Sequence, residues 1–407
     1  MIAMPPSLAG SDFLMDPATR QALAALGASD GGTRVVGGAV RNALLGAPVA
    51  DVDFATRLLP EAVIDRAERA GLEVVPTGLE HGTVTVIAGG RPFEVTTLRA
   101  DVETDGRRAV VRFTEDWAED AARRDFTMNA LYCAPDGTVF DPLGGYPDIV
   151  ERRVRFIGDA EDRIREDYLR ILRFFRLFAW YGSGRPDPDG LRACARLKGG
   201  IAILSAERVW SELKRLFAAP DPTRAMLWMR TAAILQRALP ESWGIDAIHR
   251  LVEAERSEGW PPDPLLRLES ILPPHRARID ALSERLRLSR AETARLTGWA
   301  EAPEPPEAID DTELAKAIYR TSPQAVADRI RHALAREREA GAATAVEARR
   351  HQLAFVAGWR RPVFPVSGKD LLARGMTAGP EVGRRLKELE ERWIESGFSL
   401  EPAALLG

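Results

Sequence analysis

The spacing of apolar and polar residues divides the chain into a mixed first part and a helical remainder. In the first 150 residues, short apolar or alternating runs predict strands at 33–36, 51–56, 72–75, 83–87 and 92–98. Helical spacing predicts helices at 39–46 and 60–70, the first of them closed by a glycine. The stretch 99–117 is polar and lacks clear periodicity, so we predict a mobile loop there.

After about residue 157 the strand signals stop and helical periodicity dominates. Apolar residues at helical spacing predict helices at 160–181, 189–198, 205–218 and 222–237, with more to follow. Segments rich in proline and glycine at 256–264 and 301–308 indicate joints between helical modules. The predicted fold class is therefore α+β, with a small α/β head followed by an all-α body.

Composition and charge narrow the class of protein. No apolar run approaches the roughly 20 residues that cross a bilayer, and the N-terminus lacks a signal-peptide pattern. We therefore predict a cytoplasmic protein without a membrane partner. Two isolated cysteines and five scattered histidines give no disulfide framework and no zinc-ligand spacing. The net charge is −4, but residues 151–217 contain 15 Lys/Arg against 10 Asp/Glu. That segment is either a surface that faces RNA or a solvated helix face.

The strand predicted at 51–56 contains a pair of carboxylates that suggests metal chemistry. Asp51 and Asp53 are two residues apart, so in a strand both side chains point to the same face. Like charges placed together favour a bound cation, and two divalent ions can activate a hydroxyl and stabilise a pyrophosphate leaving group. Magnesium suits carboxylates combined with triphosphate oxygens. The alternative is a solvated pair of aspartates in a turn.

Neighbouring residues favour the metal interpretation. Gly37 and Gly38 follow a predicted strand and open a helix, where backbone N–H groups can approach phosphate. Arg41 lies one turn into that helix and could reach the same phosphates. Glu94, on the strand at 92–98, could supply a third acidic group or could be an exposed strand carboxylate.

Five motifs together resemble a known enzyme family. GGAVRNALLG…DVDFAT, EVTTLR, RRDFTMNALY, DPLGG and EDYLRILRFFR occur in the order found in bacterial-type (class II) CCA-adding tRNA nucleotidyltransferases and their poly(A) polymerase relatives, members of the DNA polymerase beta nucleotidyltransferase superfamily. The similarity covers roughly residues 33–217, and GKDLLARG…GPEVGRRL resembles the family's tail more loosely. It implies a nucleotidyltransferase head at 1–150, a helical neck with the base-recognition helix at 151–220, a helical body at 221–300, and a body and tail that contact tRNA at 301–407. Asn42 departs from the aspartate usual in the family, which affects only that residue's role.

The resemblance also implies an activity and a role for individual residues. It implies template-independent addition of CCA to tRNA from CTP and ATP, with tRNA as partner, no obligate protein partner, and two Mg²⁺ ions. Asp51 and Asp53 match the metal ligands, and Gly37, Gly38 and Arg41 match the triphosphate site. The other matches are Arg124, Asp125 and Asn129 for the sugar, Asp167, Arg170 and Arg173 for the base, and Glu207 and Arg208 as neck support. The resemblance does not identify the residues of the tail that contact tRNA, for which the basic residues Lys369, Arg374, Arg384 and Arg385 are candidates.

Base choice by an acid and an arginine is chemically sound. Asp167 and Arg170 are three residues apart in a helical pattern, hence predicted on one face, where an ordinary surface ion pair is the alternative. Cytosine and adenine both present an amino donor beside a ring-nitrogen acceptor, which a carboxylate and a guanidinium can recognise. Uracil and guanine present the reverse pattern and would leave both protein groups unpaired. The polar stretch 99–117, with Asp101, Asp105 and Arg107, resembles the family's flexible loop for the switch from C to A.

Other activities stay open at this level. A poly(A) polymerase shares the head motifs, but the basic GRRF-like stretch typical of such enzymes is absent between Thr56 and Glu94. A tRNA nucleotidyltransferase that adds only CC or only A is a second alternative. A non-catalytic tRNA-binding protein would have no need of Asp51 and Asp53. A small-molecule nucleotidyltransferase would have no need of the EDYLR motif or a long helical body.

Overall fold

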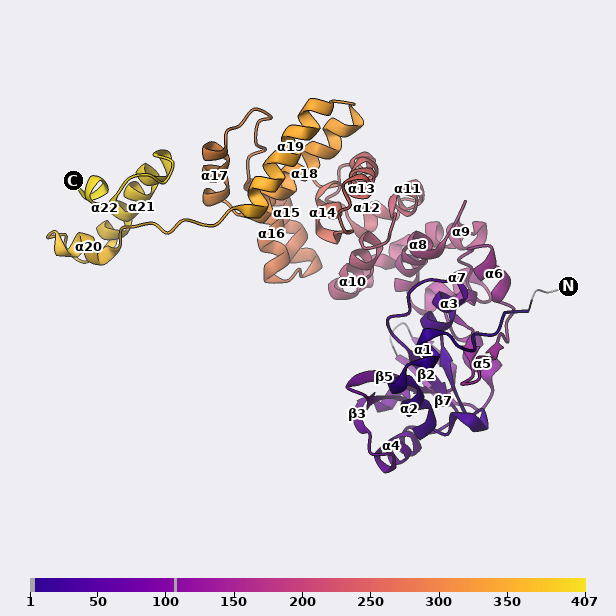
Figure 1. The fold of residues 1–407 in the computed structure, drawn as a ribbon. Helices are drawn as coiled ribbons and strands as arrows, with labels where there is room; N and C mark the ends of the chain where they lie inside the picture. Colours follow the sequence, from indigo (N-terminus) through magenta and orange to yellow (C-terminus); the bar gives the residue numbers. More distant parts are fainter. Residues whose placement is uncertain (1–3, 106–107) are drawn as a thin grey trace. The chain divides into compact units, whose positions relative to one another are not determined.

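The chain folds into two compact units, Met1–Ala238 and Leu239–Gly407. The computed structural model describes residues 4–105 and 108–407. The first unit contains all the strands that are described, and the second consists of helices only, from α13 onward (Figure 1). The predicted α+β class is confirmed.

A mixed sheet of seven described strands forms the head, in the order β3-β4-β5-β2-β1-β8-β9. β2 runs parallel to β5, and the other neighbouring strands pair antiparallel. The strands are β1 (Thr33–Val36), β2 (Asp53–Thr56), β3 (Glu73–Gly78), β4 (Thr83–Ala88), β5 (Arg91–Thr97), β8 (Tyr132–Cys133) and β9 (Val139–Phe140). The strands that were predicted in the head therefore all form.

Short helices accompany this sheet. They are α1 (Asp12–Met15), α2 (Pro17–Ala25), α3 (Gly38–Leu44), α4 (Pro60–Arg69), α5 (Trp117–Ala122) and α6 (Tyr146–Val150). α4 begins with a proline at its first position, where the missing N–H costs nothing, and it buries Val63 and Ala67. The 3-10 helices of the chain are η1 (Ala28–Asp30), η2 (Leu79–His81), η3 (Thr127–Asn129) and η4 (Lys198–Ile203).

The loop that we predicted at 99–117 was wrong. The backbone forms an antiparallel hairpin of β6 (Arg99–Asp105) and β7 (Arg108–Phe113), a separate two-stranded sheet. Alternation of polar and apolar residues in this segment is confined to 99–103, which is too short to have marked a hairpin in the sequence. Asp101 and Asp105 lie on β6, and Arg107 lies outside the described residues.

Helices complete the first unit after the head. They are α7 (Ala160–Glu166), α8 (Leu169–Tyr181), α9 (Pro188–Leu197), α10 (Ala206–Phe217), α11 (Thr223–Thr231) and α12 (Leu235–Ala238). Apolar burial fixes α8: Phe174 and Phe175 are fully buried, and Phe174 stacks on Phe156 with ring centroids 5.5 Å apart. On α10, Trp210, Leu213 and Leu216 recur at intervals of three residues, and all three are buried.

The second unit continues with helices alone. They are α13 (Asp246–Glu258), α14 (Pro264–Glu269), α15 (Arg276–Leu286), α16 (Arg290–Glu301), α17 (Asp311–Arg320), α18 (Pro323–Glu339), α19 (Ala343–Gly358), α20 (Gly368–Ala373), α21 (Pro380–Glu395) and α22 (Pro402–Leu406). Near its end, Tyr319, Leu389 and Trp393 belong to one apolar cluster.

Candidate active site

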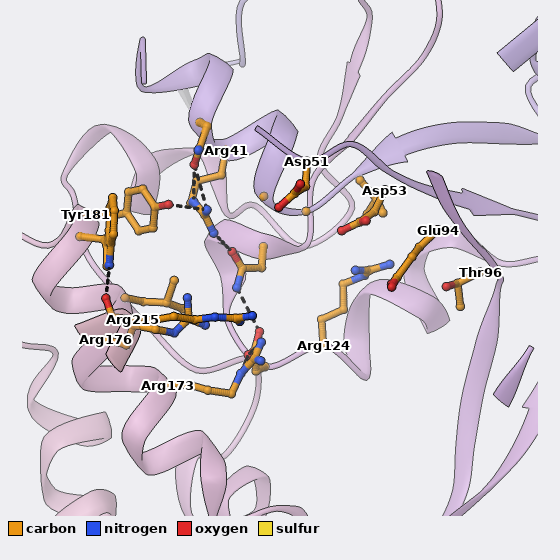
Figure 2. Close-up of a pocket in the computed structure, with 18 of the residues that line it drawn as sticks. Arg41, Asp51, Asp53, Glu94, Thr96, Arg124, Arg173, Arg176, Tyr181 and Arg215 are labelled. Atoms are coloured by element: carbon orange, nitrogen blue, oxygen red, sulfur yellow. Dashed lines mark hydrogen bonds and ion pairs between the residues drawn. The ribbon is translucent and has the colours of Figure 1, made fainter. Parts of the chain in front are cut away.

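A large pocket in the first unit gathers most of the side chains singled out from the sequence. Its volume is about 990 Å³, and it is lined by residues of the head sheet, of α3, and of α8 and α10. Figure 2 shows carboxylates entering this pocket from the head and arginines entering it from the helices.

Asp51 and Asp53 both line this pocket, together with Gly37 and Gly38. Val52 between them is buried and points the other way, which is the alternation expected of an extended segment. β2 itself begins only at Asp53, so Asp51 lies just before the strand. The two carboxylates lie close to the glycine turn because Asp53 pairs with Val36, the residue before Gly37.

Glu94 joins the two aspartates through the parallel pairing of β2 with β5. Phe54 is in register with Val95, which places Glu94 beside Asp53 on the next strand. None of the three carboxylates forms a hydrogen bond or an ion pair within the part of the chain that the structure describes. Burial, with Glu94 and Asp51 adding to it, raises the pKa of Asp53 to about 6, although Arg124 acts in the opposite direction. The side chain is nevertheless reached by water at the floor of the pocket.

This set of donors fits a divalent cation. Carboxylate oxygens are the ligands that Mg²⁺ prefers, and a cation would relieve the repulsion that raises the pKa of Asp53. Within residues 4–105 and 108–407, no three His, Cys, Asp or Glu side chains are arranged to hold a metal by themselves. A metal at Asp51 and Asp53 would therefore need further oxygen ligands, such as those of a substrate phosphate.

The glycine turn has a backbone conformation that only glycine adopts easily. Gly37 has φ of 71° and ψ of −121° directly before α3, while its N–H donates to the carbonyl oxygen of Leu131 (3.2 Å). A side chain there would meet no close neighbour, so the conformation rather than crowding explains the residue.

Arg41 lines the pocket but is largely enclosed by protein groups. It is 7% exposed, and its guanidinium donates to the side-chain oxygens of Asn42 (2.9 and 3.1 Å), Asn129 and Tyr181 (2.8 Å). Its guanidinium carbon lies 3.9 Å from the centre of the Tyr181 ring. Most of the N–H groups that were expected to contact a triphosphate are therefore engaged by protein groups (Figure 2).

A hydrogen-bond chain runs on from Arg41 to α8. Asn129 donates to Oδ1 of Asp125 (3.2 Å), and Nε of Arg173 donates to Oδ2 of the same carboxylate (2.7 Å). Burial alone would raise the pKa of Asp125, but Arg173 and Asn129 outweigh it and the net pKa is lowered. Asp125 and Asn129, expected at the sugar, are thus fixed between the head and α8.

Arg123 and Arg124 follow the end of α5 and share one carboxylate. Asp120 accepts from Arg123 (2.8 Å) and from Arg124 (2.9 Å), and it also accepts from the Tyr132 hydroxyl (2.7 Å). Burial tends to raise the pKa of Asp120, but the two arginines outweigh this effect and lower it to about 2. The Arg124 side chain lies beside Asp53 and Glu94 (Figure 2).

The uninterrupted helix predicted at 160–181 was wrong. Asp167 has extended backbone angles (φ −156°, ψ 107°) and separates α7 from α8, so it does not share a helix face with Arg170. Its Oδ1 accepts from the N–H of Leu169 (3.0 Å), and its Oδ2 accepts from Arg208 (2.6 Å). Arg170 pairs with Glu166 instead, yet Asp167 and Arg170 both line the pocket.

Comparison with known proteins identifies the family. A family described as "Poly A polymerase head domain" matches residues 33–155, and one described as "Probable RNA and SrmB- binding site of polymerase A" matches residues 185–244. The Mus musculus protein named CCA tRNA nucleotidyltransferase 1, mitochondrial, is 34% identical over 377 residues, 92% of this chain and 85% of that protein. The chain belongs to the CCA tRNA nucleotidyltransferase family.

Further relatives agree with this assignment. The CCA-adding enzyme of Geobacillus stearothermophilus is 38% identical over 228 residues, 56% of this chain and 54% of that enzyme. A crystal structure of the Bacillus stearothermophilus CCA-adding enzyme in complex with CTP superposes with a TM-score of 0.70 at 29% identity and covers 94% of both chains. A Thermotoga maritima CCA-adding enzyme complexed with tRNA shares the fold, with a TM-score of 0.64 at 18% identity over 99% of this chain and 98% of that one.

In this CCA tRNA nucleotidyltransferase family member, some residues predicted to be functional lie outside the pocket. Arg208 lines it, but Glu207, in the first turn of α10, does not. The RNA-binding candidates on or next to α20 and α21 are exposed residues of the second unit: Lys369, Arg374, Arg384 and Arg385. No helix among the described residues is long and apolar enough to cross a membrane.

Several pocket residues were not predicted from the sequence, namely Arg176, Trp180, Tyr181 and Arg215. The signal was present as spacing: Arg173, Arg176 and Trp180 recur at intervals of three and four on α8, and Arg208 and Arg215 are two turns apart on α10. These helices run alongside each other in the same direction, because Asp167, Arg176 and Trp180 contact Arg208, Glu212 and Arg215 in that order.

Proposed function

We propose that this chain adds CCA to the 3′ end of tRNA from CTP and ATP and releases pyrophosphate. The observation that supports this most is the pocket itself, in which carboxylates without arginine partners, a glycine turn and an arginine-rich helical wall meet. Relatives that align over 92% of the chain and are named CCA tRNA nucleotidyltransferases support the choice of reaction.

In this proposal Asp51 and Asp53, with Glu94 beside them, bind two Mg²⁺ ions jointly with the nucleotide. Magnesium, when bound, would withdraw electron density from the phosphate and favour loss of the proton from the attacking 3′ hydroxyl. Gly37 shapes the turn, and Gly38 offers its backbone N–H to the triphosphate. Asp125 and Asn129 hold the sugar, and their mutual hydrogen bond fixes the orientation of both side chains.

Base choice is assigned to Asp167 and Arg170. Arg208 and the Leu169 N–H orient the Asp167 carboxylate, which keeps lone pairs for the amino group of cytosine or adenine. Arg170 must exchange its present partner Glu166 for the ring nitrogen of the base. The arginine and the acid reject uracil and guanine because donor would face donor and acceptor would face acceptor.

An incorporation assay tests the reaction. Purified protein is incubated with Mg²⁺, labelled CTP and ATP, and tRNA that ends at the nucleotide before CCA, and the products are sequenced. We expect the three nucleotides CCA and no further extension. A ladder of adenylates would instead indicate a poly(A) polymerase, and addition that stops at CC or requires a CC end would indicate a partial enzyme. No incorporation with any tRNA end would refute the proposal.

A selectivity assay tests the base site separately. We expect Arg170→Ala to raise misincorporation of UTP and GTP relative to CTP more than it weakens binding of CTP. Arg165→Ala is a matched control, because Arg165 is an exposed arginine of α7 that pairs with Glu161 and Asp162 and does not line the pocket. Unchanged selectivity in Arg170→Ala would remove this residue from base recognition. The cytoplasmic location stays a prediction, since three of the relatives are named mitochondrial.

A further inference from the structure

The arginines that line the pocket differ in what they contact. Six of the nine in the described chain pair with carboxylates: Arg123 and Arg124 with Asp120, Arg170 with Glu166, Arg173 with Asp125, Arg176 with Glu212, and Arg208 with Asp167. Arg41 is enclosed by amide and phenol groups, and Arg99 donates to the carbonyl oxygen of His81.

Arg215 is the exception. Its guanidinium forms no hydrogen bond or ion pair with any described residue, and its side chain is exposed. Figure 2 shows Arg215 beside Arg176 at the helical side of the pocket, opposite Asp53 and Glu94. An arginine without a counter-charge in a pocket whose other arginines are satisfied is available to bind an anion.

Trp180 lies next to this arginine and adds a flat apolar surface. Its indole N–H donates to the backbone carbonyl of Arg215 (2.8 Å), so the ring orientation is fixed and the ring's only polar group is satisfied. The side chain is nevertheless 38% exposed and lines the pocket. An aromatic face beside a free arginine is the combination that binds a nucleotide unit of a single strand, with the base on the ring and the phosphate at the guanidinium.

We propose that Trp180 and Arg215 bind the 3′-terminal nucleotide of the RNA that is being extended. This inference rests on the proposed function and assigns the second substrate of the same pocket. Trp180 stacks on the terminal base, and Arg215 binds a backbone phosphate next to it.

Distance along the helices separates this site from the site of the incoming nucleotide. Arg215 is seven residues after Arg208, about 10 Å further along the same face of α10 at 1.5 Å per residue. Trp180 is likewise seven residues after Arg173 on α8. A base held at Asp167, the carboxylate that Arg208 orients, therefore leaves Trp180 and Arg215 to the neighbouring nucleotide. α10 also lies within residues 185–244, which match the description of a probable RNA-binding site.

Steady-state kinetics with the full chain test this proposal. We expect Arg215→Ala to raise KM for tRNA that lacks CCA about tenfold and to leave KM for CTP unchanged. The dependence of log KM on log salt should fall by about one, the contribution of a single phosphate contact. Arg237→Ala is the matched control, an exposed arginine of α12 outside the pocket with no described partner. A rise in KM for CTP, or an equal effect of Arg237→Ala, would overturn the assignment of Arg215.

Stacking by Trp180 is tested by combining variants of this residue with a tRNA that lacks its terminal base. We expect Trp180→Ala to weaken binding of the same tRNA about tenfold, and Trp180→Phe to restore most of the affinity because the ring face remains although the hydrogen bond is lost. With a tRNA whose terminal nucleotide has no base, Trp180→Ala should have no further effect. A loss of affinity that persists with the abasic tRNA, or that Phe does not restore, would overturn stacking. These measurements use tRNA binding as readout, so they stay informative even if wild-type protein adds a different sequence from CCA.

Discussion

Two clusters of carboxylates, one in each unit, show opposite ways of placing acids together. In the head, Asp51, Asp53 and Glu94 line an open pocket and have no partner among the described side chains. In the second unit, Asp328 and Glu269 are fully buried and lie around Arg295. Both clusters contain a carboxyl group whose pKa is raised, Asp53 in the first and Glu269 in the second, chiefly by burial and then by neighbouring acids.

The difference lies in what compensates the charge. Asp328 accepts hydrogen bonds from Arg295 (2.9 Å), Arg331 (3.1 Å) and Gln324 (2.9 Å), so protein groups satisfy it and tie α16 to α18. The head carboxylates are left uncompensated at the floor of a pocket. Repulsion that the protein does not relieve itself is relieved by a ligand, and this contrast is why we assign metal binding to the head and a structural role to the second cluster.

The largest expected effect is on the head. Asp53→Asn keeps the shape and removes the charge, so we expect nucleotide incorporation to fall on the order of 10³-fold or more, because metal ions contribute several kcal/mol to such a transition state. The melting temperature should stay equal or rise, since a repulsive charge is gone. The control is Asp65→Asn, an exposed acid on α4 that pairs with Arg69. Activity of Asp53→Asn within tenfold of wild type would refute the metal assignment.

The converse effect is expected in the second unit. Asp328→Ala leaves Arg295 and Arg331 without their shared acid, and breaking a buried pair costs about 3–5 kcal/mol of unfolding free energy. Urea denaturation measures the loss. Asp280→Ala, which breaks the exposed pair with Arg276, should cost less than about 1 kcal/mol. Equal costs for the two variants would mean that the buried cluster does not brace the helices.

The raised pKa of Asp53 gives a pH signature in protein freed of divalent ions. A carboxyl whose folded pKa is about 6, above its usual 3.8, stabilises the fold while it is protonated, and this contribution is lost as the pH rises through about 6. The melting temperature of wild type relative to Asp53→Asn should therefore decline between pH 4.5 and 7.5 in the presence of a chelator. Mg²⁺ competes with the proton, so stabilisation by Mg²⁺ should weaken below about pH 6. A flat difference would show that the cluster is not electrostatically coupled.

The sequence predicted the first cluster and could not have predicted the second. The placement of Asp51 and Asp53 can be predicted locally, because residues two apart in an extended segment point to the same face. Asp328 and Glu269 come from helices far apart in the chain, and as single acids in helical segments each looks like a solvated surface residue. The same limit explains why Trp180 and Arg215 were missed, since only tertiary packing of α8 against α10 joins them.

The errors have local causes. Tyr168, Leu169 and Arg170 are all compatible with a helix, so nothing in the spacing marks the break at Asp167, whose side chain takes the N–H of Leu169 in place of a helical hydrogen bond. Arg41 lines the pocket, and its contact with the triphosphate stays a prediction, although protein oxygens accept from most of its N–H groups. Its enclosure by Tyr181 depends on the end of α8, which lies 140 residues further along the chain.

The smallest expected effect on activity comes from Glu269→Gln, which replaces an acid by its amide as Asp53→Asn does. Burial, followed by Asp328, raises the pKa of Glu269 well above its usual value, and its Oε2 meets Nε2 of His332 at 3.2 Å. Burial lowers the pKa of His332 to about 3, so the imidazole is neutral and one of its ring nitrogens can accept a hydrogen bond. The side-chain amide of Glu269→Gln can donate a hydrogen bond to Nε2 of His332. Incorporation of CTP and ATP should not change in this variant.

The stability of Glu269→Gln relative to wild type should nevertheless change with pH. The unfolded Glu269 loses its proton above about pH 4.3, whereas its raised pKa delays this loss in the fold, so the unfolding free energy of wild type declines as the pH rises and that of Glu269→Gln does not. Urea denaturation should therefore give equal stabilities near pH 4 and a more stable variant at pH 7.5. If Glu269→Gln were instead less stable at pH 7.5, the acid would be ionised in the fold, and this second cluster would carry an uncompensated charge like the first.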